Sequence, residues 1–141
     1  MDALNLSFNV DASDFTRAGE CSSKVKKTLS QLGFDPSLIR KTAIAMYEGE
    51  INMVIHANGG VINVEIEPGK VVAYLKDNGP GIPDIDKAMQ EGFSTATNKV
   101  RELGFGAGMG LPNMKKYSDE MDIDTVIGKG TTVTLTFYAG A

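Results

Sequence analysis

The sequence predicts an α+β fold, a two-layer sandwich in which helices cover one face of a mixed, mostly antiparallel sheet. Apolar and polar residues alternate from Leu4 to Val10, the period of a strand with one buried face. Helical periodicity follows, and the second half contains strand patterns separated by short turns. With 141 residues and 42% hydrophobic content, the chain is long enough to bury a core and to form a single domain over residues 1–141.

The first helix is expected from Phe15 to Leu32, because apolar or small residues recur there every three or four positions. Ser13 or Asp14 would cap its start, and Gly33 would end it.

A second and longer helix is expected from Pro36 to about Ala57. Asp35 at the cap and proline in the first turn are typical of a helix start, and the Asn58-Gly59-Gly60 run would stop it. The remaining expected elements are strands at 61–66 and 71–76 joined by a hairpin turn at 67–70, a short helix at 84–91, a polar irregular segment at 92–103, a helix at 112–120, and strands at 121–127 and 131–138.

Composition argues against two classes of partner. The net charge of −4 and the sequence pI near 4.9 disfavour nucleic acid and anionic membranes, and no cluster of basic residues offsets that average. The single Cys21 cannot form an internal disulfide, and no segment has the roughly 20 apolar residues of a membrane span. We therefore expect a soluble, cytoplasmic protein.

Two glycine-rich stretches point to a phosphate ligand. The first is Asp77-Asn78-Gly79-Pro80-Gly81, and the second runs from Gly104 to Leu111 with glycine at alternate positions. Bare backbone N–H groups entering a helix form an anion site. The spacing excludes a P-loop, because no Gly-Lys pair is followed by serine or threonine, and it does not fit the dinucleotide-binding fingerprint.

The long helix carries a polar face, since Glu48, Asn52 and His56 recur every four residues. A carboxylate and an amide oxygen one turn apart suit Mg²⁺ bound to phosphates, with Asn52 as the ligand and Glu48 free to act as a base. His56 is more simply explained by packing. Glu50, two residues from Glu48, points to another face and is interpreted as structural or partner-facing.

These motifs together resemble the GHKL (Bergerat-fold) ATP-binding family. They are Glu48-x-x-x-Asn52, Asp77-x-Gly79-x-Gly81, the 104–111 glycine run and Gly130-Thr131, in the order of that family. The chain is most similar to the anti-sigma-factor serine/threonine kinases, in particular the stressosome switch kinase. Histidine autophosphorylation is not expected, because the only histidine lies inside the long helix.

The resemblance implies an ATP or ADP site with Mg²⁺. Asp77 would accept a hydrogen bond from the adenine amine with Thr131 assisting, Asn52 would hold Mg²⁺, and Glu48 would take the proton from a partner serine. A lid would span 94–101. The full set of implied nucleotide-binding residues is Asn52, Asp77, Gly79, Gly81, Ile82, Lys99, Arg101, Gly104, Phe105, Gly106, Ala107, Gly108, Met109, Gly110, Leu111 and Thr131.

The resemblance also implies partner proteins. The expected substrate is an anti-sigma antagonist with a STAS domain or a stressosome-like protein, and a sigma factor, a phosphatase or a second copy of the chain are further partners to consider. Two alternatives stay open. The chain could sequester a sigma factor or regulator in a nucleotide-dependent way with little catalysis, or it could be the ATPase subunit of a larger assembly, with Glu48 activating water.

Overall fold

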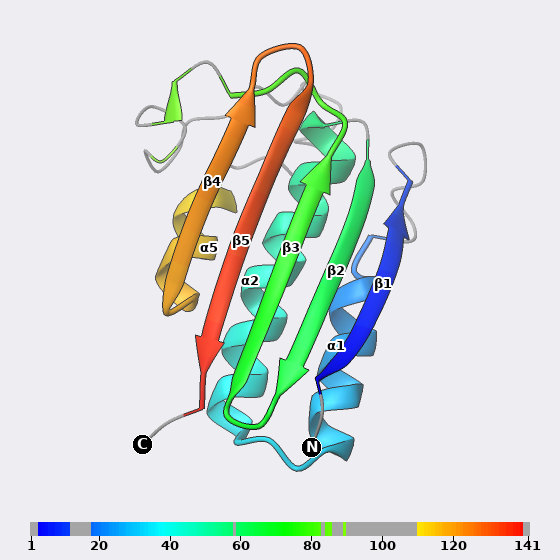
Figure 1. The fold of residues 1–141 in the computed structure, drawn as a ribbon, viewed down its shortest axis with the longest axis vertical. Helices are drawn as coiled ribbons and strands as arrows, with labels where there is room; N and C mark the ends of the chain where they lie inside the picture. The colour runs from blue at the N-terminus through cyan, green and yellow to red at the C-terminus, as the bar shows by residue number, and fades with distance from the viewer. Residues whose placement is uncertain are drawn as a thin grey trace, which may run out of the picture.

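The protein forms two layers, a sheet and a layer of helices that covers one of its faces (Figure 1). The structure is a computed structural model, and it describes residues 3–11, 18–57, 59–82, 84, 85, 89 and 110–139. Its elements are β1 (Leu4–Val10), α1 (Glu20–Gln31), α2 (Pro36–His56), β2 (Gly60–Glu67), β3 (Lys70–Asp77), α5 (Gly110–Tyr117), β4 (Glu120–Val126) and β5 (Gly130–Tyr138).

The five strands lie in the order β1-β2-β3-β5-β4, and each pairing between them is antiparallel. The predicted two-layer α+β sandwich is therefore confirmed, and the mixed character expected of the sheet is wrong for the described strands. The hairpin that joins β2 to β3 has Glu67 opposite Lys70, as its Pro68-Gly69 sequence predicts.

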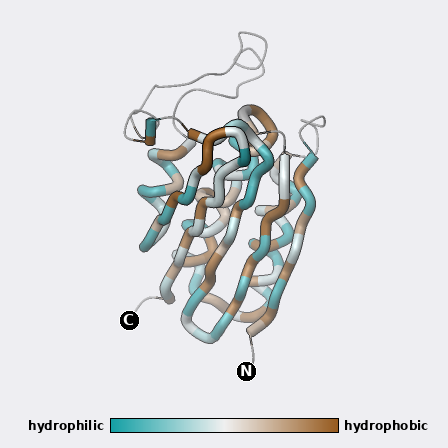
Figure 2. Tube along the Cα trace, turned by 45° about the horizontal axis from the view of Figure 1, so that its top comes forward, coloured by the Kyte–Doolittle hydropathy of each residue, from teal (hydrophilic) through white to brown (hydrophobic). Residues whose placement is uncertain are grey.

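The core lies between the sheet and the helices. Hydrophobic and hydrophilic segments alternate along the outer strands (Figure 2), so that one face of the sheet is apolar. This face carries fully or almost fully buried side chains, and the opposite face is polar, as is usual for an antiparallel sheet with one solvated side. The buried apolar residues of this face are Ile62, Val64, Ile66, Val71, Ala73, Leu75, Val133, Leu135 and Phe137.

Helix α2 lies in the middle of the helical layer, with α1 on one side and α5 on the other (Figure 1). It begins at Pro36, with proline in the first turn as predicted. The other two helices differ from their predicted bounds. Helix α5 begins at Gly110 and ends at Tyr117, since Glu120 already belongs to β4. In the described part of the chain, none of the helices combines the length and the apolar character that a membrane crossing requires.

The predicted start of the first helix at Phe15 is wrong for α1, which begins at Glu20. The N-cap is Gly19 with φ +101°, a left-handed conformation that favours glycine and interrupts a helix. The proposed caps Ser13 and Asp14 lie outside the described residues. The predicted short helix at 84–91 also lies largely outside them, although the N–H of Met89 donates to the carbonyl of Ile85 over 3.0 Å.

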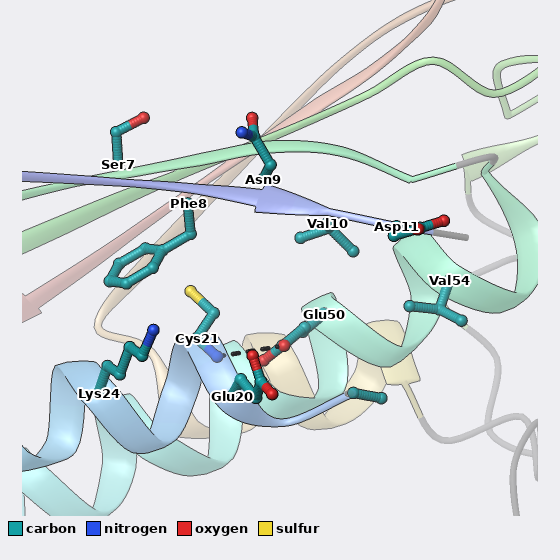
Figure 3. Close-up of a pocket in the computed structure, with 11 residues that line it drawn as sticks. Ser7, Phe8, Asn9, Val10, Asp11, Glu20, Cys21, Lys24, Glu50 and Val54 are labelled. Atoms are coloured by element: carbon teal, nitrogen blue, oxygen red, sulfur yellow. Dashed lines mark hydrogen bonds between the residues drawn. The ribbon is translucent and has the colours of Figure 1, made fainter. Parts of the chain in front are cut away.

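The start of α1 is capped by a side chain from α2. The buried carboxylate of Glu50 accepts hydrogen bonds from the backbone N–H groups of Gly19, Cys21 and Ser22, over 2.9, 3.3 and 3.2 Å. Figure 3 shows the bond from Cys21. A negative charge at this end of a helix also interacts favourably with the helix dipole. Burial, and secondly the charge of Glu50, raise the pKa of the Cys21 thiol well above its usual range, so this thiol is not a reactive nucleophile.

We expect Glu50→Ala to lower the free energy of unfolding by about 2 kcal/mol, because it leaves buried N–H groups at the start of α1 without an acceptor. Urea denaturation measures the change, and Glu67→Ala, at an exposed carboxylate at the end of β2, is the control with little expected effect. Equal stability of the Glu50→Ala and wild-type proteins would contradict a capping role.

Candidate functional site

Glu48 and Asn52 lie one turn apart on the face of α2 that packs against α5. The Oε1 atom of Glu48 accepts a hydrogen bond of 3.4 Å from Nδ2 of Asn113, a residue of α5. The Nδ2 atom of Asn52 lies 3.9 Å from Sδ of Met114, a buried residue of α5. The two predicted site residues of α2 are therefore brought together at one helix junction.

Glu50 belongs to the opposite side of α2. Glu50 is 4% exposed and its carboxylate faces α1, whereas Glu48 is partly buried and its carboxylate faces α5. The structure thus agrees with the expectation that these two acidic residues, although close in sequence, point to different faces. It gives Glu50 a structural contact within the chain.

Gly110, the first residue of α5, lies against the Asn52 amide. A Cβ atom at this glycine would be 2.7 Å from both Oδ1 and Nδ2 of Asn52, closer than side chains pack. Oδ1 of Asn52 has no hydrogen-bond partner among the described residues, because the contact with Met114 uses Nδ2. Because Gly110 has no side chain, the start of α5 can lie directly beside Oδ1 of Asn52.

We expect Gly110→Ala to weaken the binding of ADP in the presence of Mg²⁺ about tenfold or more, because the new methyl group would displace Asn52. The helix itself should tolerate alanine, a better helix former than glycine. Calorimetric titration measures the affinity, and Lys115→Ala, at an exposed position of α5, is the control. Wild-type affinity in Gly110→Ala would show that this close contact has no part in nucleotide binding.

Asp77 lies at the end of β3, as predicted, and it is partly buried. Its Oδ1 atom accepts two backbone hydrogen bonds, from the N–H of Gly79 over 3.0 Å and from the N–H of Thr131 over 2.9 Å. Oδ2 has no hydrogen-bond partner in the described part of the chain. One oxygen thus fixes the carboxylate to the protein, and the other can accept a hydrogen bond from a ligand.

The glycines around Asp77 allow backbone segments to approach one another. A Cβ atom at Gly79 would be 2.7 Å from Cα of Ala57, the residue that follows α2, and one at Gly130, where φ is +134°, would collide with the carbonyl oxygen of Asp77. Gly81 has φ +86° and lies against the carbonyl of Val126 in β4. Close backbone packing is therefore one physical reason for glycine at these three places.

Thr131 and Ile82 meet through a third residue, Thr125 of β4. The hydroxyl oxygens of Thr125 and Thr131 lie 2.8 Å apart, and the N–H of Ile82 donates to Oγ1 of Thr125 over 2.8 Å. The side chain of Thr131 is buried, and its own backbone N–H is the one that bonds Asp77. These contacts join the loop after β3 to the ends of β4 and β5.

Most of the second glycine run lies outside the described residues. Gly110 and Leu111 are described as the first residues of α5. The other predicted nucleotide-binding residues of that region lie outside the described residues, and they are Lys99, Arg101, Gly104, Phe105, Gly106, Ala107, Gly108 and Met109.

Two polar residues at the site were not predicted, namely Asn113 and Thr125. Asn113 is 65 residues from Glu48 in sequence, and Thr125 is 43 residues from Ile82. A signal for Asn113 exists in the sequence, because an amide one turn after Gly110 points back toward the start of the helix. Thr125 lies in an ordinary strand pattern and gives no such signal.

A separate cavity of about 280 Å³ lies between β1, the start of α1 and α2 (Figure 3). Phe8, Val10 and Val54 form part of its apolar wall, and Lys24 and Glu50 contribute charged groups. Because Glu50 faces this cavity from the side of α2 opposite α5, the cavity is distinct from the Glu48 and Asn52 junction.

Comparison with known proteins gives a family match over residues 45–140, described as "Histidine kinase-, DNA gyrase B-, and HSP90-like ATPase". The chain is 34% identical over 112 residues to the serine/threonine-protein kinase RsbT of Bacillus subtilis, an alignment that covers 77% of this chain and 78% of that protein. It is 37% identical over 106 residues to the anti-sigma F factor of Thermoanaerobacter sp. (strain X514), covering 72% of this chain and 69% of the relative.

A solved structure is also similar in fold. It contains the RsbU and RsbW domains of Rv1364c from Mycobacterium tuberculosis, and it superposes on 96% of this chain with a TM-score of 0.65 and 22% sequence identity. This chain spans 32% of the length of that structure, so the likeness concerns the fold of one part of it.

Proposed function

Because this chain belongs to the histidine kinase-, DNA gyrase B- and HSP90-like ATPase family, we propose that it transfers the γ-phosphate of ATP to a serine on a partner protein. Relatives that include a serine/threonine-protein kinase and anti-sigma F factors support this reading. The proposed partner is an anti-sigma antagonist with a STAS domain or a stressosome-like protein. The observation that carries the proposal is the junction of Glu48 and Asn52 with the start of α5.

The base of the nucleotide would bind at the end of the sheet. Oδ1 of Asp77 is held by two backbone N–H groups, which leaves Oδ2 to accept a hydrogen bond from the exocyclic amine of adenine. Such a bond to a charged acceptor is strong and directional, and guanine, which has a carbonyl at that position, cannot donate it. The site would therefore select adenine nucleotides.

The phosphates would bind where α5 begins beside Asn52. The first N–H groups of a helix have no partner within the helix and attract phosphate. The described residues contain no group of three or more His, Cys, Asp or Glu side chains suited to hold a metal ion. The free Oδ1 of Asn52 instead fits Mg²⁺, which prefers a few oxygen ligands together with water and substrate phosphates. Bound there, Mg²⁺ would neutralise charge on the phosphates.

Glu48 would act as the general base. Its Oε1 atom is oriented by the Asn113 amide, and Oε2 has no partner in the described part of the chain, so it can accept a proton. As the serine oxygen bonds to the γ-phosphorus, its proton passes to Glu48, and the bond from that phosphorus to the bridging oxygen breaks to release ADP. Nucleotide binding alone would not require a carboxylate at this position.

A labelled-phosphate experiment tests the proposal. The chain is incubated with Mg²⁺, ATP labelled at the γ-phosphate and a STAS-domain protein encoded near it, with a variant of that protein lacking the acceptor serine as control. Label on the wild-type partner alone is the expected result. Release of free phosphate without labelling would instead indicate an ATPase, and a stable complex with a sigma factor without any transfer would indicate the sequestering function.

A further inference from the structure

The apolar face of the sheet becomes polar in the row of residues nearest the proposed nucleotide site. Leu75, Val133 and Ile123 lie next to one another across β3, β5 and β4, and all three are apolar. Two residues further along these strands, toward the site, the same face carries Asp77 on β3, Thr131 on β5 and Thr125 on β4. Thr125 and Thr131 are directly opposite in the strand register. The sheet therefore ends in a polar row that begins with the proposed adenine acceptor.

The hydrogen bonds of Thr125 leave its single proton available for donation to Thr131. A hydroxyl group has one proton to donate and two lone pairs that accept. One lone pair of Thr125 accepts from the N–H of Ile82 over 2.8 Å, and the hydroxyl oxygen of Thr131 lies at the same distance from the Thr125 hydroxyl. If Thr125 donates its proton to Thr131, the hydroxyl proton of Thr131 remains available for another acceptor.

We propose that Thr125 is a positioning residue for base selection, which donates to Thr131 and thereby makes the Thr131 hydroxyl a hydrogen-bond donor toward the bound base. This inference rests on the proposed nucleotide site at Asp77. The base would then meet an acceptor, Oδ2 of Asp77, beside a donor, the hydroxyl of Thr131. No part of this arrangement requires Thr125 to touch the nucleotide.

Such a pair of groups distinguishes the two purines. Adenine presents an amine that donates next to a ring nitrogen that accepts, whereas guanine presents a carbonyl that accepts next to a ring N–H that donates. An acceptor beside a donor matches adenine in both positions and opposes guanine in both. A site that fixes both groups rejects the wrong base more strongly than Asp77 would alone, because mismatched polar groups stay unpaired.

Thr125 also holds the loop after β3 in place. In addition to the bond from Ile82, the N–H of Gly128 donates to the carbonyl of Pro80 over 2.8 Å, which ties the same loop to the turn between β4 and β5. This second tie does not use the Thr125 side chain. A variant without the hydroxyl should therefore keep the loop near β4. It would lose the hydrogen bond that orients the hydroxyl proton of Thr131.

The test compares ADP and GDP affinities by calorimetry in Thr125→Val, which keeps the branched shape and removes the hydroxyl. We expect the preference for ADP over GDP to fall about tenfold. Thr125→Ser, which restores a hydroxyl, should recover most of that preference. The matched control is Thr132→Val, a threonine on the opposite face of the sheet beside Asp124, where no change is expected.

An unchanged ratio of the two affinities in Thr125→Val would overturn this inference alone, and so would an equal loss of both affinities, which would indicate a purely structural role. If the valine variant does not fold, Thr125→Ala is measured in its place with the same expected ratio. Failure of the wild-type protein to bind ADP would overturn the proposed nucleotide site itself, and the inference with it.

Discussion

Glu48→Gln is expected to lower the rate of phosphoryl transfer to the partner by about 10²–10⁴-fold while nucleotide affinity stays close to that of the wild type. Glutamine keeps the size of the side chain and an oxygen that can accept the hydrogen bond from Asn113. It cannot take a proton from a serine hydroxyl. The measurement is the single-turnover rate of label transfer from ATP, together with an ADP titration.

Glu50→Gln is the matched control for this prediction, because it makes the same chemical change on the same helix at a carboxylate that faces α1. At a temperature where all three proteins are folded, this control should transfer phosphate at nearly the wild-type rate. A Glu48→Gln protein that is as fast as the wild type would contradict the role of Glu48 as a base.

Asp77→Asn is expected to weaken the binding of ATP and ADP by roughly 1.5–3 kcal/mol, which corresponds to a rise in Kd of about 10- to 150-fold. The oxygen of asparagine can keep the hydrogen bonds from Gly79 and Thr131, so the fold should change little. Its amide nitrogen would replace Oδ2 and present a donor to the adenine amine, which is itself a donor. Calorimetry and thermal unfolding measure the two effects separately.

Comparing nucleotide affinity with thermal stability tests the role of Asp77. Unchanged ATP affinity in Asp77→Asn would move the base to another part of the molecule. A large loss of thermal stability without nucleotide would instead assign Asp77 to the fold, as the link between β3 and β5.

Much of the fold could be predicted because its elements have clear local signals. The alternating pattern of β1 and the proline at the start of α2 gave their bounds closely. The predicted start of α1 at Phe15 differs from the observed start at Glu20, because helical periodicity continues through Gly19 and the capping group comes from Glu50 on another helix. Strand order was likewise not available from the sequence, since pairing between β3 and β5 depends on contacts distant along the chain.

The site divides in the same way. Glu48, Asn52 and Asp77 could be predicted, because each lies at a recognisable spacing within a motif, and the structure gives each of them an oxygen without a partner in its described residues. Thr125 could not, because its strand pattern is ordinary and its hydrogen bonds to Ile82 and Thr131 depend on the folded arrangement. Asn113 has only a weak signal, its spacing from Gly110, because its contact is with Glu48 far away in sequence. A residue that acts only by orienting another side chain does not belong to a recognisable motif of its own.

The central claim is that one nucleotide spans both places, with its base at Asp77 and its phosphates at Asn52. The direct test is calorimetric titration of adenosine and of ADP with Mg²⁺ into wild-type, Asp77→Asn and Asn52→Ala proteins. We predict that Asp77→Asn weakens both ligands, whereas Asn52→Ala weakens ADP and leaves adenosine unchanged. Absence of ADP binding to the wild-type protein at millimolar concentration, or an equal loss of adenosine affinity in both variants, would contradict the account.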